Sequence, residues 1–198
     1  TPWEFPAGRI TVDGEPDLDD AVRYADQALG DFFEQARSAP YWQDTVFLVV
    51  ADHDARAGGA SLVPLWNFRI PAMILGHDIA PRQDDRPISQ IDLAPTLLGL
   101  IGVETQHPML GADLSVRSPE RAMMQYADNY GYLRGDQLVV LEPDKPPVQF
   151  KVSSQPGAAL DMKSTPVASD PELARTALAH ALWAEDAYRH HRYRLPPP

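Results

Sequence analysis

An aspartate and a histidine stand side by side where an apolar segment of the chain ends. Residues 45–51 form a continuous β-branched and apolar run, which predicts a strand buried on both faces of a sheet, and Asp52 and His53 follow directly. Side chains beyond the carboxyl ends of such strands gather in one crevice. A carboxylate oxygen with an imidazole nitrogen suits Zn²⁺ or Mn²⁺ better than Ca²⁺, with Mg²⁺ or Ca²⁺ left possible. The pair predicts part of a divalent metal site.

The same two residues also have a purely structural interpretation. Asp52 can cap the following turn, and His53 can be a hydrogen-bonded residue at a strand end. Adjacent side chains of a strand point to opposite faces, so the two can share a metal only if the extended conformation has already ended before them. Gly58 and Gly59 favour such a turn. Arg56, on the same loop, is a candidate for binding a phosphate group, and a merely solvated arginine is the alternative.

The segments around this pair predict an α/β fold. Apolar residues at helical spacing predict a helix from Leu18, with Asp17 as its N-cap and an end at Pro40. A second strand is expected over residues 70–75. A second helix is expected to follow Asp92 and to end at Gly102. Thr96 near its start could act as a nucleophile, but a capping role is favoured.

The rest of the chain has a different texture. Residues 121–152 contain four short β-type segments separated by turns, which predict a small antiparallel annex to a first part over residues 1–120. Residues 153–169 are rich in Ser, Pro, Gly and Ala and are expected to be a linker. A C-terminal helix is expected over residues 170–190.

Composition excludes several classes of function. The formal net charge of −11 argues against a nucleic-acid partner and against anionic lipid. The chain has no cysteine, so disulfides, thiolate metal sites and a cysteine-derived formylglycine within it are excluded. The apolar runs are too short to cross a bilayer. The oligomeric state is left open.

Four segments, in order along residues 1–115, resemble the C-terminal half of the sulfatase and alkaline-phosphatase-like superfamily, most closely its lipoteichoic-acid-synthase-like branch of phosphoglycerol transferases. They are the helix with Tyr24-Ala25-Asp26 and Leu29-Gly30-Asp31-Phe32-Phe33, the strand end Ala51-Asp52-His53, the strand entry Arg69-Ile70-Pro71, and Ser89-Gln90-Ile91-Asp92-Leu93-Ala94-Pro95-Thr96-Leu97-Leu98 with Gly102. One departure is Asp54, which stands where many members have glycine.

The resemblance implies an alkaline-phosphatase-like mixed sheet with flanking helices. It implies a metal-dependent hydrolase or phosphoglycerol transferase acting on phosphate or sulfate esters through a covalent intermediate, in which the residues matching Asp52 and His53 bind the metal. The resemblance also implies that the nucleophile and the other metal ligands lie in an N-terminal half upstream of this chain, so no catalytic residue is expected within it and the chain alone is expected to be inactive. The parent is expected to be a bacterial inner-membrane protein with this domain in the periplasm. A non-catalytic α/β binding module, with Asp52 and His53 structural, is the alternative.

Overall fold

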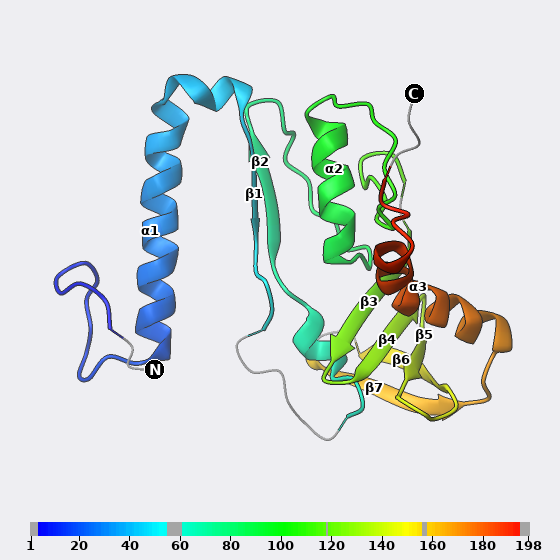
Figure 1. The fold of residues 1–198 in the computed structure, drawn as a ribbon. Coiled ribbons are helices and arrows are strands. Elements are labelled where there is room, and N and C mark those ends of the chain that lie inside the picture. Colours follow the sequence, from blue (N-terminus) through cyan, green and yellow to red (C-terminus); the bar gives the residue numbers. More distant parts are fainter. Residues whose placement is uncertain (1–3, 55–60, 118, 156–157, 195–198) are drawn as a thin grey trace. The chain divides into compact units, whose positions relative to one another are not determined.

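The computed structural model describes residues 4–54, 61–117, 119–155 and 158–194. Its chain divides into two compact units, each described here by itself. The first, which we call the helix unit, comprises Thr1–Phe47 and Leu75–Ala80. The second, the sheet unit, comprises Leu48–Ile74 and Pro81–Pro198. Figure 1 shows the elements of both.

The helix unit is built on α1, which spans Leu18–Ser38. Its first turn has a capping box, in which the Asp20 N–H donates to Asp17 Oδ1 at 3.0 Å and the Asp17 N–H donates back to the Asp20 carboxylate. The predicted cap and helix are therefore confirmed. A 3₁₀ turn, η1 (Pro40–Asp44), follows. Phe47 packs against the aromatic rings of three residues of this unit: Phe32, Phe33 and Trp42.

The two predicted strands pair with each other. Strands β1 (Val46–Val50) and β2 (Ala72–Gly76) form a two-stranded sheet, and the 3₁₀ turn η2 (Leu65–Phe68) lies between them in sequence. The expectation of full burial for β1 is wrong for this chain, because all five residues of β1 are only half-buried. The reason is that β1 pairs with β2 alone among the described residues, so little of the chain covers its apolar side chains.

The sheet unit contains a second helix and a five-stranded antiparallel sheet. A 3₁₀ turn, η3 (Gln90–Asp92), leads directly into α2 (Leu93–Leu100), which confirms the predicted helix. The sheet has the strand order β3-β4-β5-β6-β7, and each strand pairs antiparallel with the next. Its strands are β3 (Arg121–Tyr126), β4 (Asn129–Arg134), β5 (Gln137–Leu141), β6 (Val148–Gln155) and β7 (Ala158–Val167). The predicted antiparallel segments are thus present.

The expectation of a linker over residues 153–169 is wrong. Most of that segment is the end of β6 and the whole of β7, which pair with each other. Strand β7 lies at the edge of the sheet, where it needs only one partner and where proline is tolerated. Pro166 accordingly sits opposite Phe150 in the register. The Ser, Pro, Gly and Ala content of this segment therefore does not distinguish an edge strand from a linker.

Both faces of the five-stranded sheet carry a small apolar core. On one face Leu138 and Val140 pack with Val63, Met124 and Val152. On the other face, buried residues of the sheet pack against α3 (Pro171–Arg189), the helix beside the sheet in Figure 1. They are Tyr132 and Val139 from the sheet and Leu173, Ala174 and Ala177 from the helix. The alternation of Leu138, Val139 and Val140 between the two clusters follows from the two-residue period of a strand.

The predicted C-terminal helix is confirmed in α3. Asp170 is its N-cap and accepts from the backbone N–H groups of Glu172 and Leu173 at 2.8 and 3.3 Å. Within the described ranges, no helix has the length and apolar character needed to span a membrane.

Candidate functional site

Asp52 and His53 lie just beyond β1, which ends at Val50 and is followed by Ala51. The chain bends at both residues, so they have left the extended conformation that would have sent their side chains to opposite faces. The Nε2 atom of His53 lies 3.3 Å from Oδ2 of Asp52. The geometric condition for sharing one cation is therefore met.

A hydrogen bond fixes which imidazole nitrogen faces Asp52. Nδ1 of His53 lies 2.8 Å from the backbone carbonyl oxygen of Asp54. A carbonyl can only accept, so Nδ1 carries the proton and Nε2 holds the lone pair when the ring is neutral. Metal-binding histidines are commonly oriented by such a bond. The bond to Asp54 and the charge of Asp52 also raise the pKa of His53 above its ordinary value.

The two donor atoms fit a transition-metal ligand pair. Two ligand atoms about 2.1 Å from a tetrahedral ion lie about 3.4 Å apart. The observed separation of 3.3 Å between Nε2 and Oδ2 is close to that, and the side chains of His53 and Asp52 are 76% and 86% exposed. No group of three or more His, Cys, Asp or Glu residues that could hold a metal occurs in the described part of the chain. Asp52 and His53 therefore offer two donor atoms, and a tetrahedral metal site would need two more.

Two side chains that the sequence did not single out support this bend. Asn67 donates from Nδ2 to Oδ2 of Asp54 at 2.5 Å. Gln90 donates from Nε2 to the carbonyl oxygens of Ala51 and Asp52. In the sequence, Gln90 is one residue of the Ser89-to-Leu98 motif with no sign of a contact to Asp52, and Asn67 carries no signal. Arg56 lies outside the described residues.

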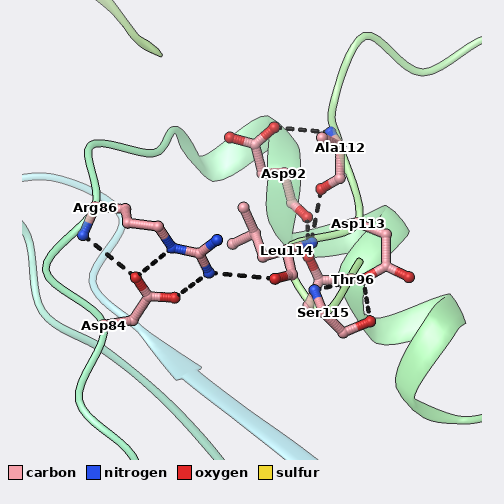
Figure 2. A network of polar contacts seen from close by, with 8 residues as sticks. All are labelled: Asp84, Arg86, Asp92, Thr96, Ala112, Asp113, Leu114 and Ser115. Carbon is pink, nitrogen blue, oxygen red and sulfur yellow. Dashed lines mark hydrogen bonds and ion pairs between the residues drawn. The ribbon is translucent and has the colours of Figure 1, made fainter. Parts of the chain in front are cut away.

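The motif around Asp92 is held by a buried network, part of which Figure 2 shows. Asp92 is fully buried, and its carboxylate accepts from the backbone N–H groups of Ser89 at 2.9 Å and Ala112 at 2.8 Å. Arg121, at the start of β3, donates to both carboxylate oxygens at 2.8 Å. This carboxylate does more than cap a turn, because it joins η3, the segment around Ala112 and the first strand of the sheet.

Thr96 is part of the same network and has no role as a nucleophile there. Its hydroxyl donates to the Asp92 carbonyl oxygen at 2.6 Å and accepts from the Leu114 N–H at 3.0 Å, and the residue is 2% exposed (Figure 2). A hydroxyl that is buried and bonded in this way cannot reach a substrate. The favoured expectation of a capping role is wrong, because Thr96 lies inside α2 and its hydroxyl instead joins this helix to the segment around Leu114.

A second polar cluster in Figure 2 joins two loops on the surface. The guanidinium of Arg86 donates to the carboxylate of Asp84 and, at 3.2 Å, to the Leu114 carbonyl oxygen. The hydrogen bond from Arg86 is the main reason that the pKa of Asp84 falls to about 2. These contacts hold the two loops together.

Comparison with known proteins finds relatives of this chain both by sequence and by fold. Residues 16–103 match the family model Sulfatase. A choline-sulfatase of Rhizobium meliloti (strain 1021) is 28% identical over 127 residues, which cover 56% of this chain and 24% of that protein. This relative is named a sulfatase, so the finer resemblance to phosphoglycerol transferases is not supported by it.

Solved structures extend the match to almost the whole chain. A protein in the alkaline phosphatase superfamily from Vibrio parahaemolyticus matches with 45% identity and a TM-score of 0.88 over 99% of this chain and 48% of that one. Ps i-CgsB matches with 16% identity and a TM-score of 0.52 over 88% of this chain and 43% of its own, which bears on the fold alone. The chain thus spans about half the length of these structures and about a quarter of the choline-sulfatase. Its fold is that of the alkaline phosphatase superfamily, and its residues 16–103 carry the sequence pattern of the Sulfatase family.

Proposed function

We propose that this chain supplies the C-terminal part of a metal-dependent, sulfatase-like hydrolase that cleaves sulfate or phosphate esters. The observation that carries the proposal is the pairing of His53 Nε2 with Asp52 Oδ2 at 3.3 Å at the end of β1, with Nδ1 turned to the Asp54 carbonyl. The match to the Sulfatase family over the same residues supports it.

The two side chains would hold one divalent cation between them. The mixed nitrogen and oxygen donors favour Mn²⁺ or Zn²⁺, and Mg²⁺ or Ca²⁺ are weaker candidates. A cation held by Asp52 and His53 would supply Lewis-acid chemistry, polarising the ester oxygens and stabilising negative charge on them. The Asp54 carbonyl keeps Nε2 of His53 directed toward Asp52, and Asp52 brings the negative charge that attracts the ion.

The nucleophile and the remaining ligands would come from an N-terminal half of the parent protein. The chain spans 48% of the Vibrio structure, and β1 is apolar along its whole length but only half-buried. An apolar strand of this kind fits the interior of a larger mixed sheet, with more strands and helices on its faces. This half is the first partner that we propose for the chain, and the ester substrate is the second.

A sulfate ester is the substrate class that we favour, because the curated relative is named a choline-sulfatase. Phosphoglycerol transfer, suggested by the sequence motifs, is the second ester chemistry that the same site would serve. Arg56 is our candidate for contacting the ester oxygens. A periplasmic location in a bacterial inner-membrane protein remains a proposal from the resemblance.

The metal half-site is tested by thermal unfolding of the chain with Mn²⁺ or Zn²⁺ added. At ten times the dissociation constant, binding stabilises the folded state by about 1.4 kcal/mol. We expect His53→Ala and Asp52→Asn to abolish the shift. His190→Ala is the matched control, since His190 is also an exposed histidine beside an aspartate, with Nδ1 3.1 Å from Asp186 Oδ1. A shift that survives in His53→Ala would contradict the proposal.

Catalysis gives the second test. We expect the chain alone to hydrolyse neither sulfate nor phosphate esters, because it lacks the nucleophile. A longer protein that includes it should hydrolyse such esters and lose that activity with His53→Ala. Turnover by the purified chain itself would refute the assignment of the nucleophile to another part of the parent. If the protein is instead a non-catalytic binding module, neither the chain alone nor the longer protein should hydrolyse these esters.

A further inference from the structure

Gln90 reaches from one element of the sheet unit to the end of another. Its side-chain amide donates from Nε2 to the carbonyl oxygens of Ala51 and Asp52, at 3.0 and 3.1 Å. Gln90 is 38 residues away from Asp52 in the sequence. The two carbonyls belong to consecutive peptide units, which are those where the chain leaves β1 and bends. One side chain thus holds the backbone on both sides of the Asp52 α-carbon.

The backbone that carries Gln90 is itself fixed. Gln90 is the first residue of η3, between Ser89 and the buried Asp92. The Ser89 N–H donates to the Asp92 carboxylate at 2.9 Å, and the Asp92 N–H donates to the Ser89 carbonyl at 2.9 Å. Arg121 binds that carboxylate from β3. The buried network therefore anchors Gln90, whose own side chain is exposed.

The chemistry of the contact requires an amide. Two carbonyl oxygens can only accept hydrogen bonds, so the group between them has to donate twice, as an NH₂ group does. A glutamate of the same length would present an acceptor to two acceptors. A methionine of similar length would offer no donor at all. These two substitutions remove the contact and keep the size of the side chain.

We propose that Gln90 is a positioning residue for the metal half-site, which fixes the bend that brings Asp52 and His53 together. The inference rests on the proposed function, since it assigns Gln90 a role toward the cation that Asp52 and His53 would bind. Gln90 does not touch that cation. It acts through the Asp52 peptide, as partners beyond the direct ligands of a metal commonly do.

The test compares Gln90→Met and Gln90→Glu with the unaltered chain. Mn²⁺ affinity is measured by titration calorimetry, and backbone hydrogen exchange of the segment containing Asp52 and His53 is measured without metal. We expect both variants to bind Mn²⁺ about 10-fold more weakly or worse, which is the usual effect of losing such a partner. We also expect faster exchange at the bend and an unchanged melting temperature.

Gln83→Met is the matched control. Gln83 is also an exposed glutamine whose Nε2 donates a hydrogen bond, at 2.9 Å to Oδ1 of Asp85, and it should leave both measurements unchanged. If His53→Ala abolishes Mn²⁺ binding while both Gln90 variants bind as the unaltered chain does, the inference is overturned and the proposed function stands. If the unaltered chain binds Mn²⁺ no better than His53→Ala does, the proposed function fails and the inference fails with it.

Discussion

Arg121 and Asp92 form a bidentate ion pair inside the sheet unit, with side chains that are 5% and 0% exposed. Each of the two guanidinium nitrogens lies 2.8 Å from a carboxylate oxygen. The same carboxylate also accepts from two backbone N–H groups, those of Ser89 and Ala112. A buried charge is tolerated when it is paired and hydrogen-bonded in this way. Removing either side chain would leave the other one charged, buried and without its partner of opposite charge.

Arg121→Met should therefore destabilise the fold strongly. Breaking a buried ion pair from one side costs about 3–5 kcal/mol. Arg189→Met is the control, because Arg189 pairs with Glu185 on the surface of α3, where its side chain is 71% exposed. That substitution should cost less than about 1 kcal/mol. Urea unfolding followed by circular dichroism measures both. Equal losses would show that the Asp92 pair is not buried in solution.

The sequence predicted the elements of the fold better than it predicted what holds them together. Residues 45–51 and the helical spacing after Leu18 gave correct strand and helix types, because periodicity and capping are local signals. Arg121 had no such signal. Its partner lies 29 residues away, and nothing in a local pattern distinguishes an arginine that pairs with a buried carboxylate from one that is solvated.

In the candidate site, too, the sequence indicated local features but not contacts between distant residues. Asp52 and His53 were identifiable because they follow an apolar run directly. Gln90 and Asn67 were not, because each contacts the bend through a hydrogen bond from a distant part of the chain. The edge strand β7 was missed for a related reason, since its pairing with β6 rather than its composition makes it a strand.

Thr96→Val should cost stability through one unsatisfied backbone group. The hydroxyl accepts from the Leu114 N–H at 3.0 Å in the buried interior, and valine has the same shape without that oxygen. Leaving a buried donor without a partner costs about 1–3 kcal/mol. Thr176→Val is the control, since the Thr176 hydroxyl donates at 3.0 Å to the Glu172 carbonyl on the exposed side of α3. Thermal unfolding should show a clear loss for the first change only. Thr96→Ser should retain most of the stability.

Gly111→Ala should be poorly tolerated because backbone occupies the space of a Cβ atom. A Cβ at position 111 would lie 1.8 Å from the Ile91 carbonyl oxygen. The substitution would therefore force η3 and the segment around Gly111 apart. Overpacking of this kind costs about 1–3 kcal/mol or more. Gly30→Ala in α1 is the control, because nothing lies within 4 Å of its Cβ position. It should stabilise the helix by about 0.5–1 kcal/mol. Unfolding midpoints that fall in both variants would contradict the prediction.

Asp52→Asn should lower the pKa of His53. The bond from Nδ1 to the Asp54 carbonyl and the charge of Asp52 both favour the imidazolium, so the pKa is raised above 6.5. A raised folded-state pKa means that these contacts stabilise the fold fully below pH 6.5, and that this contribution is lost as the pH rises through the folded-state value. The substitution removes the charge and keeps the Asp54 bond. It should therefore lower the pKa, which the ring-proton shifts of His53 report in an NMR titration.

Salt distinguishes the two causes of the raised His53 pKa, which are the hydrogen bond to Asp54 and the charge of Asp52. About 1 M salt screens exposed charges, so it should lower the pKa of His53 in the unaltered chain and leave it almost unchanged in Asp52→Asn. An identical pKa in both proteins at low salt would mean that the 3.3 Å contact between Nε2 and Oδ2 does not persist in solution. Because a cation needs the unprotonated Nε2, Mn²⁺ affinity should rise with pH through the same value. One titration of His53 thus tests both the geometry of the pair and its fitness as a metal ligand.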